Sequence, residues 1–410
     1  MVGLARSGAC VGRLLSDLGA EVWGTDHKDN ETTRANAAQL LSRGIKAELG
    51  KHSEPLIKGR DLVVLSPGVP LDAPPAAWAR TFGIPLISEI EVGWILCPAP
   101  VIAVTGANGK TTVTTLISKV LQAIGKNVFI CGNIGNPFCG EVEHISPEDF
   151  VSLEVSSFQL ETIERFRPKI SVILNLTPNH LDRYKDMGEY IAAKKRIFMN
   201  QDNSDYLVLN HEDAILKGLA RETKAQVKFF SGGEGLNPNQ AAVMAVGSIL
   251  GIDRKVCLDV FHNFKGIEHR MEQVAEIHNV VFINDSKATT ADSAVWALKN
   301  VTRPIIWIAG GRHKGIDYRV VLDYAKGKVK HAVLIGEAKS IIKEAFGNTF
   351  PAEDALTLEE AVMLAFQRAQ PGDCVLLSPM CSSYDMFHDY EERGMVFKQA
   401  VLKLKKDVST

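Results

Sequence analysis

The strongest constraint on the fold is the stretch VIAVTGANGKTTVTTLI, which occupies residues 101–117. Val101–Thr105 is a short apolar and β-branched run, which predicts a buried strand. Apolar residues then recur at positions 113, 116, 117, 120, 121 and 124, the spacing of one helix face, and Gly125 is placed to end that helix. The stretch therefore predicts a strand, a glycine turn and a helix in direct succession.

The turn between strand and helix has the composition of a phosphate-binding loop. Gly106 and Gly109 allow backbone N–H groups to point at a phosphate, and the helix N-terminus adds partial positive charge. Lys110 would reach the β- and γ-phosphates of ATP, and the Thr111 hydroxyl would bind Mg²⁺. The general pattern G-x-x-x-x-G-K-[ST] has a glycine where this chain has Val104, so the loop is a shortened form. The alternative is a glycine turn beside a solvated lysine.

Composition limits the class of protein. A chain of 410 residues is too long for one ordinary core, and two or three domains are expected. Hydrophobic residues make up 46% and charged residues 23%, and the net charge of −2 does not point to nucleic acid or an anionic membrane. No apolar run is long enough to span a bilayer, and the seven cysteines follow no metal or disulfide spacing. We expect a reduced cytoplasmic protein.

Three regions rich in strands and helices follow one another, which predicts an α/β fold with mostly parallel sheets. Their expected bounds are residues 1–97, 98–266 and 267–410. Strands are predicted at residues 101–105, 127–130, 150–155, 170–176 and 206–210 in the second region, and at 280–284, 305–309, 332–335 and 374–377 in the third.

The first region opens like a dinucleotide-binding fold. A glycine turn (Gly3, Ser7, Gly8) precedes an amphipathic helix and a strand that ends at Asp26, whose carboxylate could meet a ribose or a base. The strand that should precede Gly3 is nearly absent. A Rossmann-like half with a purely structural turn is the alternative.

Three further features of the second region could carry chemistry. Glu154 ends a strand and could hold Mg²⁺, although a solvated strand end is an equal alternative. His180 follows another strand and could be a ligand or a structural histidine. Lys194 belongs to a basic helical segment, YIAAKKRIF, whose charges alone would indicate a solvated face.

Together, these motifs resemble those of the Mur ligase family of peptidoglycan synthesis. TGANGKTT, GNIG, LEVSSFQLE, HLDRY, AAKKRI, EHRME, NDSKAT, GGRHKGIDY and SPMCSSYDMFHDYEERG occur in one order over nearly the whole chain. SSFQLE, NDSKAT and SPMCSSYDMF are the motifs most specific to the D-glutamate-adding branch. The short loop at Gly106 is similar to the phosphate loop of that family.

The resemblance implies three domains: a Rossmann-like UDP-binding domain, a central phosphate-loop ATPase domain and a Rossmann-like amino-acid-binding domain. It also implies an ATP-dependent amide ligase that phosphorylates the carboxylate of UDP-N-acetylmuramoyl-L-alanine. The amine of D-glutamate attacks the acyl phosphate, and the tetrahedral intermediate collapses to amide, ADP and phosphate. Two Mg²⁺ ions are implied. We expect no nucleic-acid partner, no membrane attachment, a monomer and a cytoplasmic location.

The resemblance also implies roles for individual residues. Lys110, His180, Lys194 and Lys314 are the implied catalytic residues. The metal ligands are Thr111, Glu154, His180 and Lys194, the last as a carbamate. ATP is bound by Gly106, Asn108, Gly109, Lys110, Thr111, Thr112, Asn239, Arg270, Asp285 and Lys287. UDP-muramoyl-alanine is bound by Ser7, Asp26, Asn133, Ser156 and Gln159, and D-glutamate by Thr289, Lys314, Ser383 and Tyr390.

The chain departs from the family pattern at three places. Residues 229–246 lack a hairpin and a His-Asn pair, so Asn239 is the residue expected on the adenine side. Natural shortening and residues omitted from this sequence both stay open, as they do for the first strand. Asn179 replaces a frequent aspartate, and Tyr390 replaces a phenylalanine, which should be mild.

Two other functions are left open. One is a sibling ligase, adding L-alanine or a diamino acid, or a folylpolyglutamate synthase-like enzyme. These enzymes share the loop and metal motifs but differ in the third-domain block. The other is a nucleotide-sugar-binding regulator without catalysis, which would require the loss of Lys110, His180 or Lys194, all present here.

Overall fold

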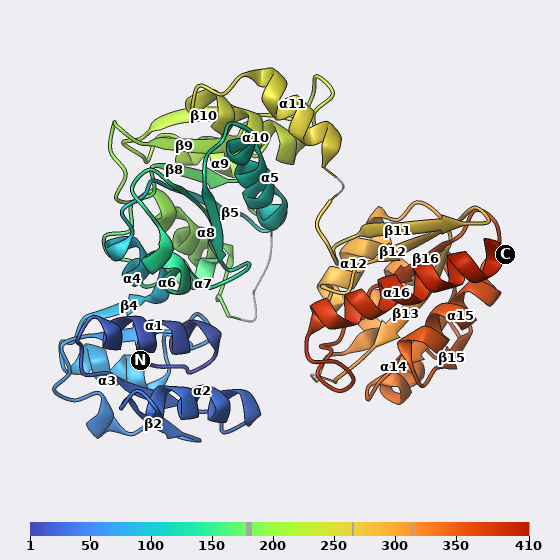
Figure 1. Cartoon of the computed structure of the whole chain (residues 1–410), viewed down its shortest axis with the longest axis horizontal. Helices are drawn as coiled ribbons and strands as arrows, with labels where there is room; N and C mark the ends of the chain where they lie inside the picture. The colour runs from blue at the N-terminus through green and yellow to red at the C-terminus, as the bar shows by residue number, and fades with distance from the viewer. Residues whose placement is uncertain (178–182, 265, 314, 410) are drawn as a thin grey trace. The chain divides into compact units, whose positions relative to one another are not determined.

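The computed structural model describes residues 1–177, 183–264, 266–313 and 315–409. The chain divides into two compact units, Met1–Phe264 and Lys265–Thr410 (Figure 1). The expected boundary at residues 97/98 lies between helix α4 and strand β5, inside the first unit. The domain bounds themselves stay predictions, whereas the α/β class with flanking helices is confirmed.

The N-terminal part of the first unit holds two pairs of short parallel strands. Val2 forms parallel bridges to both Thr25 and Leu65 and so joins the two pairs. The strand expected before Gly3 is therefore reduced to a single bridging residue. The elements are α1 (Arg6–Asp17), β1 (Trp23–Asp26), α2 (Glu31–Leu41), β2 (Lys46–Leu49), η1 (Glu54–Leu56), β3 (Val63–Leu65), α3 (Pro74–Thr81), β4 (Leu86–Ser88) and α4 (Glu89–Leu96).

The rest of the first unit is built on a six-stranded parallel sheet in the order β10-β9-β8-β5-β7-β6. Strand β5 lies between β7 and β8, so the loop after Thr105 sits where the carboxyl ends of three strands meet. The strands are β5 (Val101–Thr105), β6 (Val128–Gly132), β7 (Phe150–Glu154), β8 (Ile170–Ile173), β9 (Tyr206–Asn210) and β10 (Gln226–Phe230).

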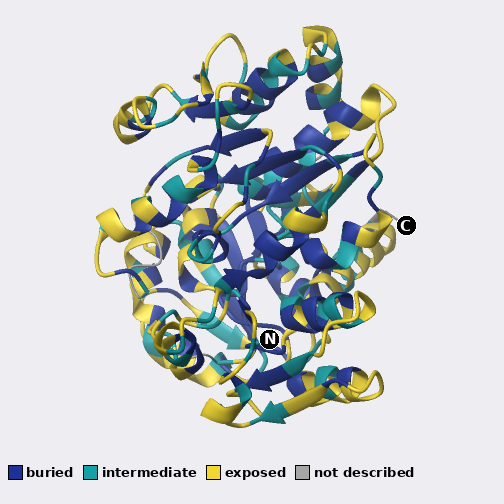
Figure 2. Ribbon diagram, turned by 90° about the vertical axis from the view of Figure 1, so that its left-hand side faces the viewer, coloured by how far each residue is buried: buried dark blue, intermediate teal, exposed yellow. Residues whose placement is uncertain are grey.

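Helices cover both faces of this sheet because its strands are apolar on both sides. Ile102 and Val104 pack with α5, α10 and α11, whereas Val101 and Ala103 pack with the helices of the other face. The buried strands run through the centre in Figure 2. The helices are α5 (Lys110–Ala123), α6 (Phe138–Glu141), η2 (Val142–His144), α7 (Ser157–Leu160), α8 (Met187–Lys195), η3 (Arg196–Phe198), α9 (Ala214–Leu219), α10 (Pro238–Ile249) and α11 (Arg254–Asn263).

The second unit contains a six-stranded sheet in the order β11-β12-β16-β13-β14-β15. Only β11 runs antiparallel, and His278 and Asn279, both with positive φ, form the turn from β11 into β12. The strands are β11 (Glu272–Ile277), β12 (Val280–Asn284), β13 (Ile305–Gly310), β14 (Val329–Ile335), β15 (Ala352–Asp354) and β16 (Cys374–Leu377).

This second sheet is also covered on both faces. Trp307 packs on one side with α12 (Ala291–Asn300), η4 (Tyr318–Val321), α13 (Leu322–Ala325) and α14 (Lys339–Phe346). Ile306 and Ile308 pack on the other with α15 (Leu358–Arg368) and α16 (Tyr390–Ser409). Within the described residues, no helix has the length and apolar character that a membrane crossing requires.

Candidate active site

The phosphate loop runs from the end of β5 to the start of α5. Gly106 (φ 153°) and Gly109 (φ 83°) adopt conformations that side chains rarely allow. A Cβ on Gly109 would lie 2.4 Å from Asn239 Oδ1, so the glycine also permits close approach of α10. Thr111 is buried in the first turn of α5, while Asn108 is exposed and Thr112 half-buried. The predicted strand, turn and helix are confirmed.

Asn175 holds the loop from the opposite side. Its Oδ1 accepts a hydrogen bond from Asn108 N at 2.9 Å, and its Nδ2 donates to Asn108 O at 3.1 Å. Its carbonyl oxygen also accepts from Ala107 N at 3.2 Å. Sequence reasoning did not single out Asn175, because an asparagine after a strand carries no distinctive pattern of its own.

Two lysines converge on the loop. Lys110 Nζ donates to the carbonyls of Gly106 and Ala107 at 3.0 and 3.1 Å. Lys194 Nζ, which comes from the last turn of α8, donates to Gly106 O and Thr105 Oγ1, each at 3.1 Å. The structure thus brings together two of the predicted catalytic lysines.

Lys194 lies in the protein interior, as the helical spacing predicted. It is 2% exposed, beneath Tyr190, whose ring centroid lies 4.9 Å from its Nζ. Burial and the Lys110 ammonium hold the pKa of Lys194 well below its usual range, and the Glu154 carboxylate offsets only part of this. Lys195 turns outward and forms an ion pair with Glu222. These surroundings favour the neutral form of the amine.

Glu154 ends β7 beside the loop and is 2% exposed. Its Oε1 accepts a hydrogen bond from Asn133 Nδ2 at 2.7 Å, whereas its buried Oε2 has no hydrogen-bond partner. A buried carboxylate oxygen without a partner is costly unless a ligand completes it, and Mg²⁺ prefers such oxygens. The residues present therefore fit a Mg²⁺ site.

The predicted metal ligand His180 lies outside the described residues. Lys314, a predicted catalytic and D-glutamate-binding residue, also lies outside them. In the part of the chain that is described, no group of three or more His, Cys, Asp or Glu side chains could hold a metal ion. This does not conflict with the predicted ligand set, which relies on a threonine hydroxyl and a carbamate as well as Glu154 and His180.

The residues predicted to bind the UDP-muramoyl substrate have structural partners. Both carboxylate oxygens of Asp26 accept backbone bonds, from Leu4 N at 2.6 Å and Lys28 N at 2.8 Å. Ser156 and Gln159 form the capping box of α7. Ser7 lies in the first turn of α1. These contacts explain the residues locally and leave their substrate role a prediction.

In the second unit, the predicted ATP residues flank the end of β12. Asp285 accepts bonds from Ser378 Oγ at 3.0 Å and Met271 N at 3.2 Å, and burial raises its pKa to about 7. Arg270 lies in the turn before β11, and its positive charge offsets part of the effect of burial on the pKa of Asp285. The Nζ of Lys287 lies 5.5 Å from the Tyr390 ring centroid.

Of the described residues predicted to bind D-glutamate, Thr289 and Ser383 lie on two neighbouring loops of this unit, and Tyr390 begins α16. Thr289 follows Ala288, whose carbonyl accepts a bond from Met380 N at 2.9 Å, and Ser383 lies three residues beyond Met380. Ser383 is buried, Thr289 and Tyr390 half-buried. The bond between the two loops shows that the segments carrying Thr289 and Ser383 are held together.

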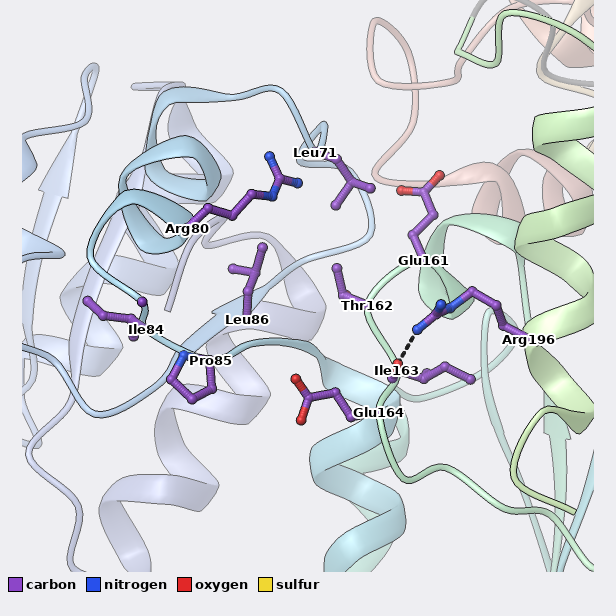
Figure 3. A pocket seen from close by; sticks show the side chains of 11 residues that line it. Leu71, Arg80, Ile84, Pro85, Leu86, Glu161, Thr162, Ile163, Glu164 and Arg196 are labelled. Atoms are coloured by element: carbon purple, nitrogen blue, oxygen red, sulfur yellow. Dashed lines mark hydrogen bonds between the residues drawn. The ribbon is translucent and has the colours of Figure 1, made fainter.

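A separate pocket of about 420 Å³ lies between the α3–β4 segment and residues 161–164 of the first unit. Figure 3 shows Arg80 and Leu71 on one wall and Glu161, Glu164 and Arg196 on the other. Two of its charged groups are engaged within the protein: Glu161 pairs with Arg183 at 2.8 Å, and Arg196 donates to backbone carbonyls. None of the predicted site residues lines it.

A glycine loop at the centre of a parallel sheet, with a lysine on its helix and a buried carboxylate beside it, defines a phosphate-loop nucleotide-binding protein. Comparison with known sequences specifies the family. The sequence profile of the Mur ligase middle domain matches residues 104–284, and that of the Mur ligase glutamate ligase domain matches residues 269–381. The chain belongs to the Mur ligase family.

Curated relatives match over almost their whole length. A protein of Pelotomaculum thermopropionicum named UDP-N-acetylmuramoylalanine--D-glutamate ligase is 40% identical, over 99% of this chain and 97% of that protein. A Clostridioides difficile protein of the same name is 39% identical, over 99% and 98%. The fold also resembles the UDP-N-acetylmuramate-alanine ligase of Thermotoga maritima, with a TM-score of 0.59, 20% identity and coverage of 98% and 99%.

Proposed function

We propose that this chain is the ATP-dependent ligase that adds D-glutamate to UDP-N-acetylmuramoyl-L-alanine in peptidoglycan precursor synthesis. The observation that carries the proposal is identity of about 40% with D-glutamate ligases over 99% of the chain. The phosphate loop with Lys110, Lys194 and Glu154 around it supplies the chemical basis.

The chain's own groups account for the first half of the reaction. A carboxylate is a poor electrophile, so it must be activated by phosphate before an amine can attack it. The loop N–H groups and Lys110 would hold the ATP phosphates in line with the substrate carboxylate. Thr111 and Glu154 would hold Mg²⁺, which neutralises phosphate charge when bound. Positive groups beside the ATP phosphates reduce the repulsion between these phosphates and the substrate carboxylate.

Lys194 has a finer role in this proposal. As a carbamate it would present two oxygens instead of an ammonium and would support the metal site together with His180. Its burial and lowered pKa support this role, because only the neutral amine adds CO₂.

The remaining roles extend to the other substrates. The adenine and ribose side would use Asn239, Arg270, Asp285 and Lys287, and the proximity of Asn239 to Gly109 supports the first of these. D-Glutamate carries two carboxylates and would be met by Lys314, Thr289, Ser383 and Tyr390. The muramoyl substrate would contact Ser7, Asp26, Asn133, Ser156 and Gln159.

A sibling ligase is disfavoured by the names of the relatives at about 40% identity, which are D-glutamate ligases. A regulator without catalysis is disfavoured because Lys110, His180 and Lys194 are all present. We further propose a cytoplasmic monomer, which light scattering after size-exclusion chromatography would test.

The deciding experiment measures phosphate release from ATP in the presence of Mg²⁺. We expect release only when UDP-N-acetylmuramoyl-L-alanine and D-glutamate are both present, with the amide product identified by mass spectrometry. A panel of L-alanine, L-glutamate, L-lysine and diaminopimelate in place of D-glutamate separates the sibling activities. Release with one of these and not with D-glutamate would refute the proposal.

A further inference from the structure

Arg393 is a large, fully buried cationic side chain that lies within the SPMCSSYDMFHDYEERG motif but was given no predicted role in the site. It lies in the first turn of α16 and is 1% exposed. Its Nε donates to Ser286 Oγ at 2.9 Å, its Nη2 to Ser286 O at 2.7 Å and its Nη1 to Cys381 O at 3.1 Å. Burial lowers its pKa to about 10, so it stays charged at neutral pH.

The guanidinium lies at the junction of three loops. Ser286 belongs to the loop that carries Lys287 and Thr289, and Cys381 to the loop that carries Ser383. A Cβ on Gly311, in the loop that leads toward Lys314, would lie 3.3 Å from Arg393 Nη1. One planar fork therefore bonds the segments that carry Thr289 and Ser383, and it lies beside Gly311 of a third loop.

In the second unit, Asp285, a predicted ATP-binding residue, is held by bonds that do not involve Arg393. Asp285 is held by Ser378 Oγ, by Met271 N and by its own N–H, which donates to Leu377 O at 2.8 Å. Thr289 and Ser383 lie at the outer ends of segments that Arg393 fixes through the Ser286 and Cys381 carbonyls. Lys287, the predicted ATP residue next to Ser286, has an anchor of its own, because its N–H donates to His269 O at 3.0 Å. Loss of the fork should therefore disturb the amino-acid side more than the nucleotide side.

We propose that Arg393 is a positioning residue that sets the spacing between the Thr289 and Ser383 segments and so determines affinity for the amino-acid substrate. The inference rests on the proposed function and deepens it. A lysine at this position keeps the charge but has no planar fork, and so cannot reproduce two directional bonds to Ser286 and one to Cys381.

The test compares Arg393→Lys and Arg393→Gln with the wild-type protein. We expect KM for D-glutamate to rise about ten- to hundredfold while KM for ATP changes by less than about threefold. The matched control is Arg368→Lys, an exposed arginine of the same unit that pairs with Glu353, and it should leave both constants unchanged. Added guanidinium should partly restore D-glutamate affinity to Arg393→Ala.

The measurements distinguish failure of the proposed function from failure of the inference about Arg393. A wild-type protein that does not use D-glutamate overturns the function. A wild-type protein that does, with Arg393 variants whose two KM values rise equally or not at all, overturns the inference alone. If the Arg393 variants do not fold, Ser286→Ala removes one acceptor of the fork. It should raise KM for D-glutamate selectively, though less, and an equal effect on ATP would count against the role.

Discussion

Lys110 and Lys194 donate hydrogen bonds to the same acceptor, the carbonyl oxygen of Gly106, at 3.0 and 3.1 Å. They reach it from different helices, since Lys110 begins α5 and Lys194 lies at the end of α8. Burial and the nearby Lys110 ammonium both lower the pKa of Lys194, since a second positive charge at this carbonyl would be repelled. Either an anionic ligand or loss of one positive charge would relieve it.

The first prediction concerns Lys110. Lys110→Ala removes the cation aimed at the β- and γ-phosphates but leaves the backbone loop, so turnover should fall at least about a hundredfold with the fold intact. Steady-state phosphate release and the circular dichroism spectrum measure the two effects. Lys119→Ala, on the exposed side of the same helix, is the matched control and should behave as wild type. Near-normal ligation by Lys110→Ala would mean that this loop is not the ATP site.

The second prediction concerns the metal. Glu154→Gln keeps the size of the side chain and an oxygen for Asn133 but removes the charge at the partnerless Oε2. The Mg²⁺ concentration for half-maximal activity should rise about tenfold or more. A Mg²⁺ titration of phosphate release provides the measurement, with the exposed Glu212→Gln as control. An unchanged Mg²⁺ requirement would exclude Glu154 as a ligand.

The sequence predicted the buried strands closely. β5, β9, β12 and β16 have the expected bounds, because strands buried on both faces are continuous apolar runs between turns. β10 (QVKFF) and β11 (EQVAEI) were not predicted, since these edge strands mix exposed polar and buried apolar residues. Their place in the sheets depends on pairing with a neighbour, which no local pattern encodes.

For the site, local motifs identified the loop and the inward side of α8, because glycine spacing and helical periodicity are local properties. Asn175 and Arg393 were missed because their partners are distant in the chain. Asn175 contacts a residue 67 positions away, and Arg393 a residue 107 positions away. The role of a single polar residue can be inferred only once the folded structure shows which residues it contacts.

The third prediction concerns pH and stability. Glu89 is fully buried in α4, and burial raises its pKa from 4.5 to about 7. Between these pH values Glu89 keeps a proton in the folded state that it has lost in the unfolded state. Its contribution to the free energy of unfolding is therefore greatest below pH 4.5 and falls as pH rises toward 7. At about 1.4 kcal/mol per pH unit, the total loss is about 3 kcal/mol.

Glu89→Gln should remove this component of the pH dependence. The free energy of unfolding of Glu89→Gln, relative to that of the wild type, should therefore be greater at pH 8 than at pH 5, by about 2.5 kcal/mol. Urea unfolding followed by tryptophan fluorescence at both pH values provides the measurement. The exposed Glu143→Gln is the control and should show no such change with pH. The same difference between Glu89→Gln and wild type at both pH values would contradict the argument.

The last prediction concerns Lys194 and uses its neighbour as an internal control. A protonated lysine beside Mg²⁺ would weaken the site. An amine that has released its proton can add CO₂ and release a second proton, so that the side chain's charge changes overall from plus one to minus one. Burial and the Lys110 ammonium both favour the neutral amine.

Lys194→Ala should therefore lose at least about a hundredfold in activity, and formate or acetate should partly restore it by supplying the missing carboxylate oxygens. Lys195→Ala should lose little activity and should not respond to added carboxylate, because Lys195 points outward to Glu222. Activity measured against carboxylate concentration distinguishes the two variants, and a fully active Lys194→Ala protein that ignores added carboxylate would end the carbamate proposal.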